Sequence, residues 1–400
     1  GRTSMKAIVL GGGNDQISLI TALKKRGYIV WMIDYNQNPI AKPFADYHIM
    51  KSTLNEAEVR DVIEHVRPDL IITCCTDQAL FIAAEMAEEF GLFFPISAIQ
   101  AKHLTNKKWM KGVLEQAHIP TAKSIIAKEF DASNFSDLSL PIVIKPVDSN
   151  SSKGVVKVNN KSELEPCFSY SSQYSRSGEV ICEEYLEGTE ISIDAYVRNG
   201  KAIYLLSSIL EKLGGNRTDF PICRSISPAP LSINAQRGII CILQKIVDAF
   251  ELVNCPLIVQ AMIKDDEIRV IELSARTGGG SKHHLINFMT GIDVIELFID
   301  DCEKKYSPIE PILLDRKLAM QYIYAEPCVF GHIEGLEKLK QEKKIIDYYI
   351  YKTKGMEIRN ASNSGDRCCG FLADADKVKS AIEGFDIFDI NKCKVGKIWN

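Results

Sequence analysis

Three polar side chains that could do chemistry alternate with apolar ones in the segment RVIELSARTGGG, residues 269–280. The polar residues are Glu272, Ser274 and Arg276, and the apolar ones are Ile271, Leu273 and Ala275. A strand with this period buries one face and projects a carboxylate, a hydroxyl and a guanidinium from the other. Such groups could hold a divalent cation and stabilise a phosphoryl group.

The residues before this segment predict a partner strand at 257–263, joined to it through the charged turn 264–267. A three-residue loop centred on Asp266 places Gln260 opposite Glu272. Two oxygen ligands on neighbouring strands suit Mg²⁺. After the strand, Gly278, Gly279 and Gly280 would let the backbone approach a ligand closely. An ordinary hairpin with an edge charge is the alternative interpretation.

A second candidate segment begins with the strand PIVIK at 141–145, which ends in Lys145. The loop 147–155 follows it, and its small or cationic residues include Ser149, Ser151, Ser152, Lys153 and Gly154. Backbone N–H groups and ammonium charges in such a loop could cover phosphates. The alternative is a solvated hairpin turn. The loop is not a P-loop, because the pattern G-x-x-x-x-G-K-[ST] is absent.

Residues 180–197 predict two strands around Gly188, with the acidic side chains Glu183, Glu184 and Glu190 in apolar surroundings. They could supply acceptors for an adenine amino group and for ribose hydroxyls. Further upstream, residues 105–120 predict a helix opened by Lys107 and Lys108 and capped by Asn106.

The N-terminal residues supply the elements of a doubly wound α/β sheet. Residues 6–34 read as strand, Gly-rich turn, helix and strand, and helices at 56–66 and 77–90 flank a further strand at 70–74. The turn at Gly11–Gly13 does not complete G-x-G-x-x-G, because Gln16 stands where the third glycine would be. A substrate-facing turn is therefore favoured over a dinucleotide site. Asp77 lies at a strand's carboxyl end, where it could bind a ligand or only cap a helix.

Composition narrows the class of protein. Four hundred residues imply two or three domains, and a net charge of −4 gives no electrostatic case for nucleic acid or membrane partners. Residues 1–4, GRTS, resemble an expression scar, and no signal peptide or transmembrane run is recognised. The twelve cysteines then indicate reduced thiols in the cytoplasm, and the spacing of Cys and His residues favours no zinc site.

Together these segments resemble the ATP-grasp superfamily. Lys107 precedes Ile119-Pro120 in the form N-K-x₁₁-I-P, PIVIKP supplies Lys145, EEYLEGTE resembles the hinge E-x-[YW]-L-x-G-x-E, and IELSAR resembles E-[IL]-N-x-R. The resemblance implies that ATP is bound by Lys107, Lys145 and the loop 151–154. Adenine would meet Glu183, Glu184 and the backbone of Tyr185 and Leu186, and ribose would meet Glu190.

The same resemblance implies that Mg²⁺, or Mn²⁺ in its place, is held by Glu272, Gln260 and Ser274, with Arg276 on the transferred phosphoryl group. Two departures stand out, because the superfamily usually has a carboxylate at position 260 and Asn at position 274. An amide oxygen can still ligate Mg²⁺, but it carries no charge.

The implied fold is an ATP-grasp fold within the α/β class. Its expected parts are an N-terminal Rossmann-like domain at 5–102, an ATP-grasp domain at 103–315 with a mobile lid at about 122–185, and a C-terminal α+β subdomain at 316–400. A homodimer through the N-terminal domain is common among relatives.

The implied function is an ADP-forming ligase that joins a carboxylate to an amine through an acyl-phosphate, acting on an amino acid or a similar small metabolite. Catalysis would rest on Arg276 and Lys145. The substrate would be met by Gly278, Gly279, Gly280, Arg224 and His283, although Arg224 and His283 could each be structural. Two alternatives stay open: a bicarbonate-activating enzyme of the carboxylase or carbamoyl-phosphate synthase kind, and a nucleotide-binding regulatory protein with a degenerate metal site.

Overall fold

The computed structural model describes residues 4–149, 153–215 and 221–400. Its N-terminal part is a parallel four-stranded sheet in the order β3-β2-β1-β4, with helices on both faces. The strands are β1 (Lys6–Leu10), β2 (Ile29–Ile33), β3 (Tyr47–Ile49) and β4 (Leu70–Ile72), and the helices are α1 (Asn14–Lys25), α2 (Glu56–Val66) and α3 (Asp77–Glu89). This is the predicted doubly wound arrangement.

A nine-stranded sheet forms the centre of the molecule and runs in the order β13-β12-β9-β10-β11-β14-β18-β16, with β21 paired to β14. Its strands are β9 (Thr189–Arg198), β10 (Lys201–Lys212), β11 (Ile222–Ser227), β12 (Cys255–Lys264), β13 (Glu267–Ser274), β14 (Leu318–Ala325), β16 (Asp347–Ile350), β18 (Cys369–Asp374) and β21 (Lys397–Ile398). Helix α7 (Ile233–Ala249) packs its apolar face, including Ile239 and Ile246, on this sheet.

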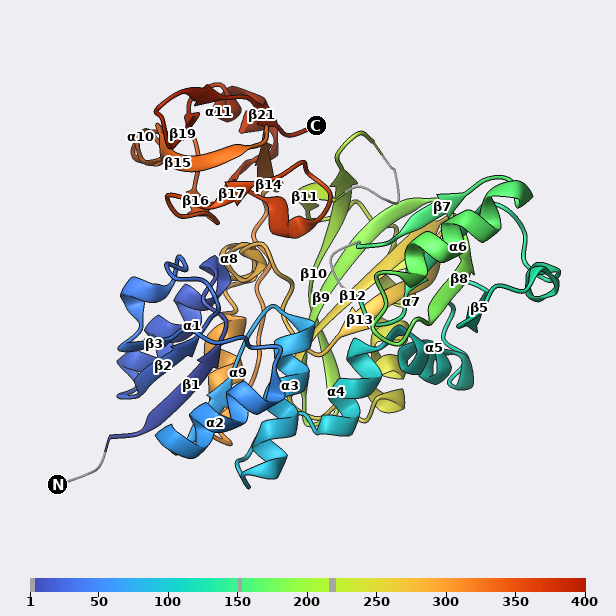
Figure 1. The fold of residues 1–400 in the computed structure, drawn as a ribbon, viewed down its shortest axis with the longest axis horizontal. Coiled ribbons are helices and arrows are strands. Elements are labelled where there is room, and N and C mark those ends of the chain that lie inside the picture. The colour runs from blue at the N-terminus through green and yellow to red at the C-terminus, as the bar shows by residue number, and fades with distance from the viewer. Residues whose placement is uncertain (1–3, 150–152, 216–220) are drawn as a thin grey trace.

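Two smaller sheets flank the centre. One has the order β5-β8-β6-β7 and carries α6 (Leu164–Ser172); its strands are β5 (Ser124–Ala127), β6 (Ile142–Pro146), β7 (Val156–Val158) and β8 (Val180–Glu184). The other has the order β17-β15-β19-β20, with β15 (Cys328–Glu334), β17 (Glu357–Ile358), β19 (Asp386–Asp389) and β20 (Lys394–Val395), beside α10 (Leu336–Gln341) and α11 (Val378–Ile382). Figure 1 shows the N-terminal sheet (blue) and the C-terminal elements (red) on one side and the β5–β8 sheet (green) on the other.

The remaining helices connect these layers. They are α4 (Ala98–Thr105), α5 (Lys107–Gln116), α8 (Lys282–Thr290) and α9 (Val294–Cys302). The single helix expected at 105–120 was wrong at both ends, because Thr105 ends α4, and α5 begins at Lys107 and ends at Gln116. The predicted cap is correct: the Asn106 side chain accepts hydrogen bonds from the backbone N–H groups of Lys108 and Trp109. No helix in the described part of the chain is long and apolar enough to cross a membrane.

The hairpin of β12 and β13 has the predicted pairing of Gln260 with Glu272, but it reaches this pairing by a different route. The loop has two residues rather than three, Asp265 and Asp266, and both adopt positive φ, as a tight hairpin turn requires. A bulge then skips Ile271 and restores the register of Glu272. The prediction that Ile271 faces the core was therefore wrong, because this side chain lies in the wall of a cavity.

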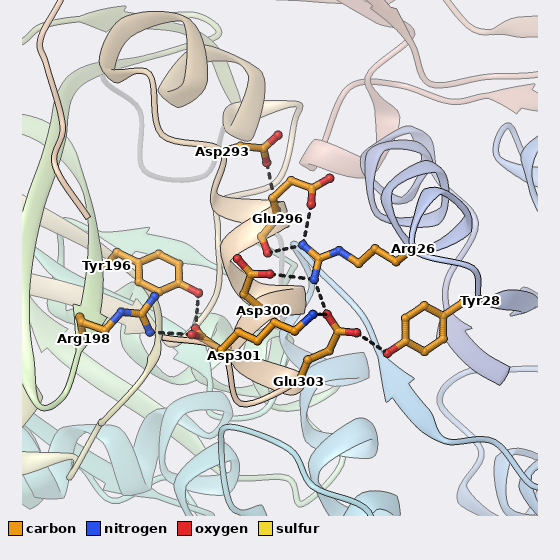
Figure 2. A network of polar contacts seen from close by, with 10 residues as sticks. Arg26, Tyr28, Tyr196, Arg198, Asp293, Glu296, Asp300, Asp301 and Glu303 are labelled. Atoms are coloured by element: carbon orange, nitrogen blue, oxygen red, sulfur yellow. Dashed lines mark hydrogen bonds and ion pairs between the residues drawn. The ribbon is translucent and has the colours of Figure 1, made fainter. Parts of the chain in front are cut away.

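A cluster of ion pairs joins α1 to α9 (Figure 2). The Arg26 guanidinium lies 2.6 Å from Glu296, 2.8 Å from Asp300 and 2.5 Å from Glu303, and Tyr28 donates to Glu303 at 2.9 Å. On the other face of α9, Arg198 pairs with the buried Asp301 at 2.6 Å. These contacts place the N-terminal sheet against the central sheet, since α9 packs between them.

We predict that Arg26→Met lowers the free energy of unfolding by about 2 kcal/mol, because three carboxylates lose the cation that they share. Urea unfolding at pH 7 measures the change. Burial alone would raise the pKa of Glu303, but hydrogen bonds from Tyr28 and Arg26 hold it below its ordinary value of 4.5. The stabilisation by Glu303 is therefore present above pH 4.5 and is lost as the pH falls through the lowered pKa.

The matched control is Arg60→Met, which removes a single pair with Glu89 on an exposed surface. This variant should unfold like the parent chain. Equal losses from the two variants would contradict the role given to the Arg26 cluster.

Candidate functional site

A cavity of 370 Å³ opens between the central sheet, the β5–β8 sheet and the N-terminal elements. Residues from segments far apart in the sequence line it, and they include most of the predicted site. The predicted residues in its wall are Lys107, Lys145, Glu183, Glu184, Tyr185, Leu186, Glu190, Gln260, Glu272, Ser274, Arg276, Gly278 and Gly279.

The three predicted metal donors lie together on β12 and β13. Gln260 is the direct cross-strand partner of Glu272, and Ser274 is buried two residues further along β13, with its side chain near Asp77. A carboxylate, an amide oxygen and a hydroxyl are hard oxygen donors, which suit Mg²⁺ or Mn²⁺. The residues present therefore fit a divalent cation, with one formal negative charge among them.

A buried triad of charges holds the second predicted lysine. Glu183, only 6% exposed, lies 3.0 Å from the ammonium of Lys145 and 2.9 Å from that of Lys111. Burial raises the pKa of Glu183, but Lys145 and Lys111 together bring it down to about 2. Burial lowers the pKa of Lys145, and Glu183 and Glu272 more than offset this, so Lys145 stays charged. The Glu183 carboxylate is thus engaged with lysines, and its role is to hold Lys145 in the cavity.

The predicted hinge lines the cavity through Tyr185 and Leu186, where backbone groups could meet an adenine ring. The Lys157 ammonium lies 3.8 Å from the centroid of the Tyr185 ring. The Glu184 carboxylate instead accepts a hydrogen bond from the backbone N–H of Ser139. Glu190 pairs with Lys212 at 3.3 Å and keeps one buried oxygen without a partner among the described residues, which leaves it able to accept from a hydroxyl.

The first predicted lysine, Lys107, meets the loop after β6. Its ammonium donates to the carbonyl of Ser149 at 2.7 Å, and its backbone N–H donates to Val147 at 2.8 Å. Ser151 and Ser152 lie outside the described residues. Lys153 and Gly154 are not among the residues that line the cavity, although their neighbour Val155 is.

Arg276 is held by a residue of the N-terminal sheet. Its guanidinium donates to Asp77 at 2.6 Å, across 199 positions of sequence. Burial raises the pKa of Asp77, but the Arg276 charge holds it below its usual range. Asp77 opens α3 from the carboxyl end of β4, so the ion pair aims Arg276 into the cavity.

The Gly-rich loop after Arg276 is also anchored by the N-terminal part. The Asp15 carboxylate accepts from the backbone N–H groups of Gly280 at 3.1 Å and Ser281 at 2.6 Å. Tyr322 donates to the carbonyl of Gly280 at 2.7 Å, and a Cβ at Gly280 would lie 2.3 Å from Arg367. Only glycine leaves room here for the Arg367 guanidinium, which stacks on Tyr322 and lines the cavity.

Gly280 is not in the cavity wall, and neither are two other predicted substrate residues, Arg224 and His283. Arg224 pairs with Glu211 at 3.2 Å and donates to Gln321 at 2.8 Å. His283 is buried behind the Gly-rich loop, where its Nε2 contacts Ser18 and burial lowers its pKa well below the usual value. The structure thus gives both residues structural contacts. The turn at Gly11–Gly13 likewise stays outside the wall.

Sequence reasoning missed three cations in the cavity wall, Lys212, Lys282 and Arg367, and a fourth, Lys111, that is buried against Glu183. Lys111 lies within N-K-x₁₁-I-P and Lys282 follows the Gly-rich segment, but neither motif assigns a role to these positions, so only the tertiary contacts reveal them. It also missed that Asp15, Cys75 and His283 gather their ligand atoms within 4.8 Å of one another. Both oxygens of Asp15 already accept backbone N–H groups, so this cluster serves to anchor the Gly-rich loop.

Comparison with known proteins agrees with this geometry. Residues 138–284 match the model of the ATP-grasp domain. The chain contains an ATP-grasp domain. A curated formate-dependent phosphoribosylglycinamide formyltransferase of Maridesulfovibrio salexigens is 25% identical over 280 residues, which span 68% of this chain and 70% of that protein.

Solved structures extend the likeness to the whole fold. An L-amino acid ligase from Bacillus licheniformis superposes with a TM-score of 0.77 at 20% identity, covering 97% of this chain and 100% of that one. The biotin carboxylase domain of Hydrogenobacter thermophilus 2-oxoglutarate carboxylase gives a TM-score of 0.77 at 17% identity, covering 99% and 92%. The predicted superfamily, fold class and general enzyme class, an ATP-grasp ligase, are confirmed at this level.

We predict that Glu183→Gln lowers the free energy of unfolding at pH 7 by about 3 kcal/mol, because Lys111 and Lys145 stay buried without their counter-charge. In the parent chain, Glu183 has a pKa of about 2, below its ordinary 4.5, so its stabilisation is complete above pH 4.5 and is lost as the pH falls toward 2. The difference between variant and parent should therefore shrink across that range, as urea unfolding at several pH values would show.

Glu184→Gln is the matched control, since its carboxylate accepts only the Ser139 N–H among the contacts described and is not part of the charge triad. A loss for Glu184→Gln as large as that for Glu183→Gln would argue against the triad.

Proposed function

We propose that this protein is an ADP-forming carboxylate–amine ligase that works through an acyl-phosphate on an amino acid or a similar small metabolite. The observation that carries the proposal is that one cavity is lined by two different groups of residues. One wall offers a hinge and lysines that suit a nucleotide, and the other offers Arg276, Arg367 and a Gly-rich loop that suit an acid. A phosphoryl group could pass between them without leaving the cavity.

At the nucleotide end, the hinge backbone at Tyr185 and Leu186 would receive adenine, and Glu190 would accept ribose hydroxyls. Lys107 and Lys145 would lie along the phosphates and neutralise their charge. Glu183 keeps Lys145 charged and in place, so little reorganisation is needed when the nucleotide arrives. Glu272, Gln260 and Ser274 would hold Mg²⁺ or Mn²⁺, which supplies further neutralisation of phosphate charge when bound.

At the acid end, Arg276 would stabilise the transferred phosphoryl group. Its ion pair with Asp77 fixes its direction, and electrostatic stabilisation of this kind contributes several kcal/mol. Arg367, buried against Tyr322, would receive an anionic group of the substrate. The Gly-rich loop, held by Asp15, would bring backbone N–H groups close to the substrate carboxylate.

An amine would then attack the acyl-phosphate carbon, forming a C–N bond and releasing phosphate. The loop 147–155 would exclude water from the acyl-phosphate during this step.

We further propose that the chain is organised as an N-terminal domain at 5–102, an ATP-grasp domain at 103–315 with a lid at about 122–185, and a C-terminal subdomain at 316–400. We also propose that the chain forms a homodimer. We place it in the cytoplasm, in keeping with its free cysteines.

The test is ADP release from ATP and Mg²⁺ with a panel of amino acids, other small carboxylates including formate and bicarbonate, and amines including ammonia. We expect ADP only with one acid and its amine, together with a product whose mass is the sum of the two less water. Mass spectrometry identifies that product. ADP with bicarbonate alone would contradict the proposal in favour of bicarbonate activation, and nucleotide binding without turnover across the panel would favour a regulatory protein.

Arg276→Met should lower kcat by a factor of about 100 or more while nucleotide affinity changes little, because its charge acts on the phosphoryl group in transfer. Arg224→Met is the matched control, since Arg224 does not line the cavity, and it should retain kcat. Equal losses in the two variants would contradict the assignment of Arg276.

A further inference from the structure

A buried lysine stands in the cavity wall next to the metal donors. Lys282, the first residue of α8, is 4% exposed and lines the cavity. Its ammonium lies 3.1 Å from the Ser192 hydroxyl and 3.2 Å from the Asp194 carboxylate, both on β9. Asp194 is 2% exposed and is not among the residues that line the cavity, whereas Lys282 and Ser192 both line it.

Strand register places this ammonium beside the metal donors. Ser192 is the direct partner of Gln260 across β9 and β12, and Gln260 is the direct partner of Glu272 across β12 and β13. Directly opposed residues of antiparallel strands point to the same face, at a strand spacing of about 5 Å. Glu272, Gln260 and the Lys282 ammonium on Ser192 therefore follow one another along one row of the sheet.

The charges along this row suit one divalent cation and not two. Glu272 is its one carboxylate, whereas Gln260 and Ser192 offer neutral oxygens. A second divalent ion at Gln260 would have no carboxylate of its own in this row and would stand about one strand spacing from a fixed ammonium, which repels it. The site still has to neutralise a triphosphate. The Lys282 ammonium supplies positive charge next to Gln260, where a second metal ion would otherwise lie.

The ion pair of Asp194 and Lys282 places a negative and a positive charge side by side, as a carboxylate ligand and its metal ion would. The carboxylate lies on the neighbouring strand β9, two residues beyond the direct partner of Gln260, and the cation belongs to the chain. Resting on the proposed function, we propose that the Lys282 ammonium takes the place of a second divalent cation beside the triphosphate, so that the loaded site holds one metal ion per nucleotide.

The first measurement counts metal ions rather than turnover. Mn²⁺ is titrated into the full chain saturated with the slowly hydrolysed analogue AMP-PNP, and free Mn²⁺ is followed by its electron paramagnetic resonance signal. We expect one bound Mn²⁺ per chain, and two would overturn the inference while leaving the proposed function intact. Absence of AMP-PNP binding in calorimetry would instead overturn the proposed function, and the inference with it.

The second measurement removes the ammonium. Lys282→Met should weaken AMP-PNP binding about tenfold or more and leave adenosine binding unchanged, because only the phosphates face the lost charge. Lys264→Met is the matched control: this exposed lysine pairs with Glu187 at the hairpin end and should bind AMP-PNP like the parent chain. Unchanged AMP-PNP affinity in a folded Lys282→Met chain would overturn the inference.

Removing Lys282 leaves Asp194 buried without its ion pair, so a second variant guards against loss of folding. Lys282→Met with Asp194→Asn removes both charges and should show the same tenfold loss for AMP-PNP. Gln260→Glu alone should still bind one Mn²⁺, whereas Gln260→Glu with Lys282→Met should bind two. A second Mn²⁺ in Gln260→Glu alone would show that the ammonium does not exclude it, and would overturn the inference.

Discussion

The ion pair between Arg276 and Asp77 is the contact on which the rest of the site depends. Arg276 follows directly after the strand that carries Glu272 and Ser274, and Asp77 begins a helix of the N-terminal sheet. At 2.6 Å, the pair ties the carboxyl end of β4 to the end of β13, and the cavity lies at this junction. Since both groups are mostly buried, each needs the other to stay charged.

The same junction is reinforced around the pair. Asp15 binds the backbone of the Gly-rich loop, Tyr322 binds it from the C-terminal part, and Arg26 fastens α1 to α9. All three parts of the chain therefore meet at one loop. An enzyme that must align two reactants gains from such fixed groups, because misplacement by an ångström is costly in rate.

Charge balance explains why so many lysines can be buried near one another. Glu183 serves Lys145 and Lys111, Glu190 serves Lys212, and Asp194 serves Lys282. Each of these cations is held by an acid, so a triphosphate would meet ammonium groups that are already desolvated and oriented. Glu272 and Glu184 differ, because no cation of the described residues pairs with either directly. Glu184 accepts the Ser139 N–H instead, whereas the lack of a paired cation at Glu272 fits a metal ligand.

The sequence by itself determined the local elements and the order of the motifs. Alternation predicted the strand at 269–275, Asn106 marked a helix start, and the blocks around Lys107, Lys145, Glu183 and Glu272 indicated the superfamily. These features are readable because periodicity, capping and turn chemistry act over a few residues. Even the pairing of Gln260 with Glu272 was predictable, although the bulge that produces it was not.

Only the tertiary structure decided which charges meet. Glu183 was expected at adenine but lies between two lysines, Arg224 was considered for the substrate but pairs with Glu211, and Arg367 entered the cavity without any local signal. Ion pairs over such distances in sequence depend on how sheets pack, and no period of two or 3.6 residues encodes that packing. Lys282 is the clearest case, because the register of β9 and β12 decides that its ammonium, on Ser192, lies next to Gln260.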